Sequence, residues 1–468
     1  MAENMGRSIF RLGAGAFFLA FMVFPLAMLL FNLQLFPLPA NLILRNLFQA
    51  SLSAALAILL GLPLSYALLH KTPFSRLLNS LSLVPLVLPQ PVMILSLVLL
   101  FGNNGLFDLP FSLYGIEGIV LAHMLYNFPL AAKIISSGWA RVSNLEPVGR
   151  VLGADPFRAF LFVTLPSLRN PIASAFAVVF AFSFTSFSIP LVFGGIANST
   201  IEVEIFRTFF RDFNFQKGAF LALLQIMAFL PLAAFWSGFR WELFPKKESG
   251  SKIADALSLI YLAIFSLILL PPLCHMKLFD SSLSPIFNSI YLGAISAILC
   301  VILWLLVGRK FSHQSFLLFG ISPAVLAVSY FFLPYTFWLL PIGHAILSFA
   351  LVSSILLPFS DSLDKYEAAA SGLGADGLQN FRHIYLPLMV RPLLLAFSFS
   401  FAFSLGETAF LTSLSQGFPT MSTVLLQAFS SYRFAEGYFY SALLILIAMI
   451  FAFLMEGLHI FSHEARGA

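Results

Sequence analysis

Long apolar runs dominate the chain, and polar positions gather in short stretches between them. A helix needs about 20 mostly apolar residues to cross the hydrocarbon core of a membrane. That length predicts twelve membrane-spanning helices, at residues 12–32, 48–68, 80–101, 116–137, 171–194, 218–238, 256–274, 286–307, 316–334, 336–357, 390–412 and 438–459. The third contains three prolines, and the ninth and tenth adjoin one another. The pattern therefore predicts an all-α integral membrane protein.

Composition excludes a soluble globular protein. Of the 468 residues, 60% are hydrophobic and 10% are charged, whereas soluble chains average about 45–50% apolar and about 25% charged. Cys274 and Cys300 both lie in apolar segments, so neither a disulfide framework nor a cysteine metal site is expected. The first apolar run is too long for a signal peptide and predicts a retained helix in the lipid bilayer.

The distribution of charge predicts an orientation. Lys and Arg collect in cytoplasmic loops of membrane proteins, and most of the 25 in this chain fall on one side if the N-terminus is cytoplasmic. Both termini are then expected inside. The net charge of +5 reflects this topology, so no nucleic-acid partner is needed to explain it.

Two polar inserts, residues 146–166 and 367–387, repeat one pattern at a constant spacing of 221 residues. The identical pairs include Glu146 and Glu367, Gly153 and Gly374, Ala154 and Ala375, Asp155 and Asp376, Phe160 and Phe381, Leu165 and Leu386, and Pro166 and Pro387. Such a repeat predicts two parallel six-helix halves. The expected division is a first half at 1–240 with a loop at 141–169, a linker at 241–255, and a second half at 256–468 with a loop at 361–390.

Each insert has the chemistry of two short helices joined by a turn. The Gly permits a sharp turn, and the Asp two residues later can cap the next helix. Apolar Phe160 or Phe381 would then project from the cytoplasmic face and suit a groove on a partner protein. The alternative is an amphipathic loop that rests on the membrane surface.

The inserts resemble the EAA loop of permease subunits of binding-protein-dependent ABC importers. The matching residues are Ala369, Ala370, Gly374, Ile384, Leu386 and Pro387 in the second copy and Gly153, Leu165 and Pro166 in the first. Glu146 and Glu367 each stand one residue before the family's Glu, and Val148 and Gly149 replace the two alanines in the first copy. The resemblance implies the type I importer permease fold, in which this loop is the coupling helix that docks on a cytoplasmic ATPase.

Two such loops on one chain imply a fused permease that works with two ATPase copies and a periplasmic substrate-binding protein in a bacterial inner membrane. Residues 111–135, 184–225, 404–414 and 430–458 resemble the corresponding stretches of thiamine permeases, a subfamily close to ferric-iron permeases. This resemblance implies import of thiamine or its phosphates, with ferric iron as the alternative.

Glu407 lies within the eleventh predicted span, and Ser186 occupies the matching position of the first half. An ionisable group within a span usually faces a protein interior or a wet cavity. Glu407 either lines a pathway for a cationic substrate, together with aromatic rings, or is a structural carboxylate bonded to a neighbouring helix. His123 and His344, also matched, favour packing hydrogen bonds over a metal site. The outer loops 201–217 and 430–436 either meet the binding protein or are solvated.

The chain lacks a G-x-x-x-x-G-K-[ST] phosphate loop, so ATP would be used by the partner subunit and no cofactor is expected here. G-x-S-x-G and H-E-x-x-H motifs are also absent, which disfavours a membrane-embedded enzyme. An ion-coupled secondary transporter remains the hypothesis of another class, since it can share the twelve-span layout. The paired inserts are the feature that separates the two.

Overall fold

The computed structural model describes residues 27–151, 153–236, 248–276, 282–308, 321–331, 333, 337–414 and 417–464. Within these ranges the chain is helical apart from its loops and one isolated β-bridge between His70 and Glu248. The all-α prediction is therefore confirmed. The first predicted span, 12–32, lies mostly outside the described residues.

The helices of the first half follow the apolar runs. They are α2 (Ala40–Leu69), α3 (Ser75–Val87), α4 (Gln90–Phe101), α5 (Ile116–Val142), α6 (Leu145–Val151), α7 (Pro156–Ala159), α8 (Leu165–Ser167), α9 (Arg169–Phe184), α10 (Ile201–Phe206) and α11 (Phe215–Trp236). Three short π-helical turns complete this half. Phe160–Thr164 extends α7, Pro190–Gly194 precedes the 195–200 loop, and Arg207–Arg211 follows α10.

The second half repeats this order with its own set. Its helices are α12 (Lys252–Cys274), α13 (Ser284–Leu303), α15 (Pro323–Tyr330), α16 (Leu339–Gly372), α17 (Gly377–Asn380), α18 (Leu386–Gly406), α19 (Ala409–Leu414), α20 (Met421–Ser430) and α21 (Phe434–Glu464). π-Helical turns at Trp304–Gly308 and Phe381–Tyr385 continue α13 and α17.

Within the described part of the chain, seven helices are long and apolar enough to cross a membrane, or up to nine if two bent pairs each count as one span. The third predicted span is one of these pairs. It bends by 104° between Ser75–Pro85 and Gln90–Phe101, because Pro89 cannot continue a helix and places Leu88 in an extended conformation.

The span predicted at 171–194 ends at Phe184, before a separate π-helical turn at Pro190–Gly194. Two later predicted spans also differ from the structure. In place of the span at 316–334 there is the eight-residue helix α15, which Ser322 caps through its side chain and which Pro323 opens; residues 309–320 are not among those described. The span predicted at 390–412 stops at Gly406, and a separate short helix, α19, follows. Both differences arise from helix starts inside an apolar run, which hydropathy alone does not register.

Small side chains let the central helices approach closely. Ala50, Ala54, Ala57 and Gly61 recur along one face of α2, and the three alanines are fully buried. A Cβ at Gly61 would lie 2.8 Å from the Phe128 backbone oxygen of α5. Because lipid supplies no hydrophobic drive between helices, such small-residue faces hold membrane bundles together through van der Waals packing.

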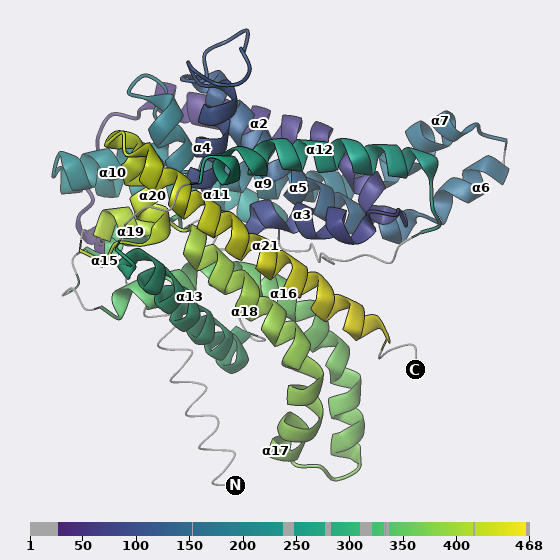
Figure 1. Ribbon diagram of the computed structural model, residues 1–468. Helices are drawn as coiled ribbons and strands as arrows, with labels where there is room; N and C mark the ends of the chain where they lie inside the picture. The colour runs from purple at the N-terminus through teal and green to yellow at the C-terminus, as the bar shows by residue number, and fades with distance from the viewer. Residues whose placement is uncertain are drawn as a thin grey trace.

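Each half has a three-helix centre, α2, α5 and α9 in one and α13, α16 and α18 in the other. α12 of the second half packs along α2 and α4 of the first half, and α21 of the second half packs on α3 of the first. Helices of the second half therefore contact the first half along much of its length. In Figure 1 the short helices α10, α15, α19 and α20 gather at one end, while α6 with α7 and α17 project from the molecule away from them.

The predicted linker, 241–255, is described only from residue 248 onward. Glu248 exchanges backbone hydrogen bonds with Leu69 and Lys71, at 2.8 and 3.1 Å, so this segment is fixed to the end of α2. α12 begins at Lys252, inside the predicted linker. The division of the chain at residue 240 stays a prediction.

Candidate functional site

The two inserts fold into the same turn. Gly153 and Gly374 have φ angles of +91° and +90°, the region that favours glycine. After Gly374 the Ala375 N–H bonds the Ala370 carbonyl at 3.0 Å, and the Gly374 N–H bonds the Ser371 carbonyl at 3.1 Å. This pair of bonds is a Schellman motif, which ends α16.

The predicted Asp caps are confirmed in both copies. Asp155 accepts hydrogen bonds from the N–H groups of Phe157 and Arg158, both at 3.0 Å. Asp376 accepts from Leu378 and Gln379 at 2.8 and 2.7 Å, and Gln379 returns a bond to complete a capping box. Each insert is therefore a rigid helix–turn–helix with a fixed direction for α7 or α17.

The apolar surface of each insert differs from the prediction. Phe160 is partly buried and packs on Trp139, with ring centroids 5.9 Å apart. Phe381 is partly exposed and stacks on Tyr385 at 5.9 Å. On the helix that follows the capping Asp, Phe157, 71% exposed, and its counterpart Leu378, 50% exposed, project further. They lie one helical turn before the predicted aromatics, next to the capping Asp.

The remaining predicted insert residues lie around this turn. Glu146 belongs to α6, and Glu367, Ala369 and Ala370 belong to the last turns of α16. Ala154 and Ala375 are the partly buried residues between Gly and Asp. Leu165 and Leu386 begin α8 and α18, with Pro166 and Pro387 as the next residue, where a missing N–H is tolerated.

A cavity of about 180 Å³ lies between the two halves. Twelve of its lining positions form six pairs 221 residues apart: Tyr126 and Leu347, Leu130 and Leu351, Ala181 and Ala402, Phe182 and Phe403, Thr185 and Gly406, and Phe187 and Thr408. Corresponding faces of the two repeats thus meet at this cavity. Its lining is mainly apolar and aromatic, with a few polar groups, which is the usual character of small-molecule sites.

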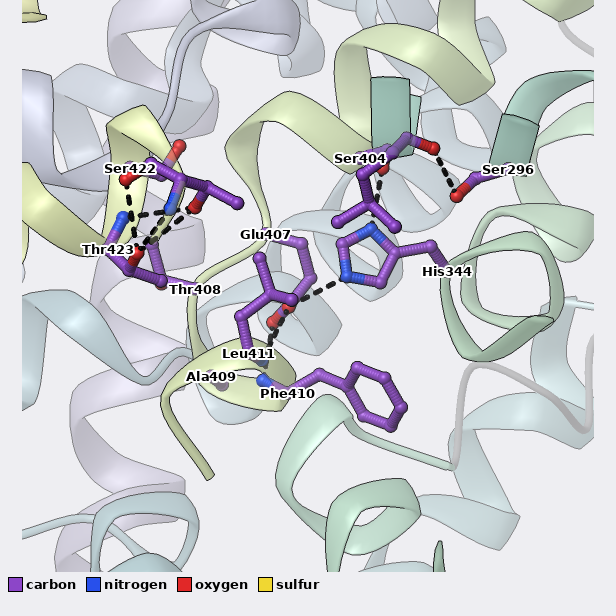
Figure 2. A network of polar contacts seen from close by, with 12 residues as sticks. Ser296, His344, Ser404, Glu407, Thr408, Ala409, Phe410, Leu411, Ser422 and Thr423 are labelled. Atoms are coloured by element: carbon purple, nitrogen blue, oxygen red, sulfur yellow. Dashed lines mark hydrogen bonds and ion pairs between the residues drawn. The ribbon is translucent and has the colours of Figure 1, made fainter. Parts of the chain in front are cut away.

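Glu407 is the carboxylate in the lining of this cavity. It lies at the break between α18 and α19 and not inside a continuous span. Figure 2 shows its carboxylate directed at the start of α19, where it accepts hydrogen bonds from the Phe410 and Leu411 N–H groups at 2.9 and 3.3 Å. Glu407 therefore caps a helix, as a structural carboxylate would, and it also faces the cavity, as a pathway-lining group would.

The matched histidines make hydrogen bonds within the bundle. His123 Nδ1 lies 3.2 Å from Gln49 Oε1, and His344 Nδ1 lies 2.6 Å from Ser404 Oγ. His344 Nε2 is also 3.4 Å from a Glu407 oxygen (Figure 2). Among the described residues no group of three or more His, Cys, Asp or Glu side chains is placed to hold a metal ion.

The first half has no acid where the second has Glu407. Ser186 is buried and donates to Gln90 Oε1 at 3.1 Å, and Gln90 lines the cavity. Ser188 and Thr408 share a hydrogen bond of 2.6 Å between the halves. The cavity is therefore pseudo-symmetric in shape but asymmetric in charge.

Glu202 is a buried carboxylate that the sequence analysis placed in an outer loop. In the structure α10 turns into the molecule, and Glu202 is fully buried. Its oxygens accept from Gln225 Nε2 at 2.6 Å and from the Ala324 N–H at 2.9 Å. The charged residues that follow Glu202 are typical of a loop. The local sequence feature that indicates a helix here is Thr200, whose side chain caps the start of α10.

Lys133 and Glu456 belong to a second buried polar cluster, which the hydropathy pattern did not predict. Lys133 is buried in α5, and its Nζ lies 3.3 Å from Asn79 Oδ1. The Asn79 amide lies 3.5 Å from Glu456 in α21, which also accepts from Ser80. Asn79 thus connects a buried cation of the first half to a buried carboxylate of the second.

Comparison with known proteins agrees with this arrangement. Residues 57–240 match the family model described as binding-protein-dependent transport system inner membrane component. The chain is 26% identical over 476 residues to the thiamine transport system permease protein ThiP of Escherichia coli (strain K12), covering 88% of each chain. It is 27% identical over 478 residues to ThiP of Haemophilus influenzae, again covering 88% of each.

A shorter match reaches the molybdate/tungstate transport system permease protein WtpB of Thermococcus kodakarensis, at 33% identity over 139 residues, which is 29% of this chain and 53% of that protein. The first half is thus similar to permease domains of the binding-protein-dependent transport type, and the similarity to permeases continues through the second half. Nothing in these comparisons favours a ferric-iron or an ion-coupled transporter.

Proposed function

We propose that this permease is the membrane-spanning subunit of an ABC importer that passes thiamine or its phosphates from a periplasmic binding protein to the cytoplasm. The observation that carries the coupling half of the proposal is the matched pair of helix–turn–helix inserts. Each presents a capped short helix with an exposed apolar residue, Phe157 or Leu378. Such a helix fits a groove on a partner protein.

Two copies of a cytoplasmic ATPase would therefore dock, one at loop 141–169 and one at loop 361–390. ATP would be bound and hydrolysed by those subunits, and this chain would hold no cofactor of its own. The inserts and both termini would face the cytoplasm of a bacterial inner membrane. The exposed side chains near Tyr432 and Arg433, at the far end of the molecule, would then be available to the binding protein.

The cavity supports a cationic aromatic substrate. Thiamine carries a fixed positive charge on an aromatic ring, and the lining offers Glu407 with the rings of Tyr126, Phe182 and Phe403. A carboxylate among aromatic faces attracts such a ring by charge and by cation–π interaction. Ferric ion prefers several hard oxygen ligands, and the described lining supplies one carboxylate.

The identity of the substrate is tested by the ligand of the partner binding protein. We expect equilibrium binding measurements to give tight binding of thiamine or thiamine pyrophosphate and no binding of ferric ion. In proteoliposomes, the complete complex should import that ligand only with ATP inside. Ferric-ion binding would replace the substrate assignment, and uptake that stops with an uncoupler but ignores ATP would contradict the ABC mechanism.

A further inference from the structure

Glu202 acts across the boundary between the halves. It belongs to α10 of the first half, yet its Oε1 accepts a hydrogen bond from the Ala324 N–H in the first turn of α15, in the second half. Glu202 therefore caps the N-terminus of a helix whose first turn is 122 residues away in the sequence.

The start of α15 faces the substrate cavity. Ile321, Ser322 and Pro323 are part of the cavity lining, whereas Glu202 is not. The free N–H groups at a helix N-terminus are equivalent to about half a positive charge, and that charge favours anions. An uncovered α15 would therefore direct a positive potential toward any substrate in the cavity.

The start of α19 has the same arrangement. Thr408 and Ala409 line the cavity at this helix start, and the Glu407 carboxylate accepts from the free N–H groups of its first turn. Interrupted helices in transporters commonly direct bare N-termini at anionic substrate groups. Here α15 and α19 each carry a carboxylate on the first turn, whereas α4, which also starts at the cavity with Gln90, has no side-chain cap among the described residues.

We propose that Glu202 is a specificity-determining residue, which cancels the positive N-terminus of α15 from behind the cavity wall and so makes the cavity acceptable to a cation. This inference rests on the proposed function, because it concerns the charge of the substrate that crosses. Glu202 is a positioning residue that acts through α15 and does not touch the substrate.

Glu202→Gln separates the charge from the hydrogen bonds. The glutamine oxygen can still accept from the Ala324 N–H. Gln225 Oε1 is buried and has no hydrogen-bond partner among the described residues, so Gln225 can rotate its amide to accept from the new NH2 group. The variant therefore keeps both contacts and loses only the negative charge.

The test compares two substrates of opposite net charge. Thiamine is a cation and thiamine pyrophosphate is a net anion, so each is supplied separately on saturating loaded binding protein to complexes in proteoliposomes. We expect Glu202→Gln to lower thiamine uptake per ATP hydrolysed by about five- to tenfold, the size of a partly buried helix-terminus charge effect. Uptake of thiamine pyrophosphate should stay the same or rise.

Two further variants fix the interpretation. Glu202→Gln/Gln225→Glu returns a carboxylate to the same hydrogen-bonded pair and should restore the preference for thiamine. Glu117→Gln, in the first turn of α5, removes an exposed carboxylate that is not in the cavity lining, and it should leave both substrates unaffected.

Equal loss of both substrates would show a structural role and would overturn the proposal, as would an unchanged ratio of thiamine to thiamine pyrophosphate. If Glu202→Gln does not assemble, the ratio of thiamine to thiamine pyrophosphate uptake by Glu202→Gln/Gln225→Glu tests the proposal: a ratio equal to that of the wild type supports it, and a lower ratio overturns it. A wild-type complex that imports neither compound contradicts the proposed function instead, so the two failures are distinguishable.

Discussion

Replacing Gly374 by valine is expected to abolish ATP-driven uptake while the protein still inserts and folds in the membrane. Gly374 has a φ of +90°, and a Cβ there would meet nothing within 4 Å in the described part of the chain. The damage is therefore confined to the turn. An L-residue in the left-handed region is destabilised by about 1–2 kcal/mol, and a β-branched residue is a strong outlier there.

Since about 1.4 kcal/mol is a factor of ten, the turn that directs α17 at its partner would become a minor conformer. Uptake and ATPase stimulation by loaded binding protein are measured in proteoliposomes, and retention of the ATPase is measured by co-purification. The same change at Gly153, with φ +91° and equally open space, tests the first copy. Unequal losses would show that the two docking contacts differ.

Two controls lie in the same turn. A side chain at Gly372 would also enter open space, but the φ of this glycine is not positive, so Gly372→Val should transport normally. Asparagine tolerates the left-handed region, so Gly374→Asn should retain most activity. If Gly374→Val still couples ATP hydrolysis to uptake at the wild-type ratio, loop 361–390 is not the docking element.

The inserts were predictable because their structure is local. A Gly followed two residues later by Asp contains its own turn and its own cap, and the repeat at 221 residues supplied a second copy of the same pattern. The long apolar runs likewise predicted α2, α5, α12 and α21, since length and hydropathy suffice to specify a span.

The cavity chemistry was only half predictable. Glu407 was visible because a carboxylate in an apolar run is rare, but its place at a helix break was not, because Gly406 and Glu407 read as part of the run. Glu202 was missed entirely. Its partners, Gln225 and Ala324, are 23 and 122 residues away, so its burial depends on tertiary contacts that no local pattern records.

Exchanging Glu407 for glutamine should reduce thiamine uptake by at least about tenfold, without loss of assembly. Glutamine keeps an oxygen for the Phe410 N–H, which the carboxylate now accepts at 2.9 Å, so the start of α19 stays capped. What disappears is the negative charge in the cavity lining, together with the longer hydrogen bond from the Leu411 N–H at 3.3 Å. At an effective dielectric of about 20, two unit charges about 4 Å apart attract by about 4 kcal/mol, which leaves ample margin for a tenfold effect.

Ser186→Ala is the matched control, because Ser186 holds the equivalent position in the first half and its hydroxyl donates to Gln90 at 3.1 Å. Loss of one neutral hydrogen bond is worth about 1 kcal/mol, so its uptake should fall by less than that of Glu407→Gln. Initial uptake rates at saturating loaded binding protein compare the two variants. Glu407→Gln with wild-type kinetics would leave the carboxylate as a helix cap alone, and the attraction for the cation would then have to come from the aromatic rings of Tyr126, Phe182 and Phe403.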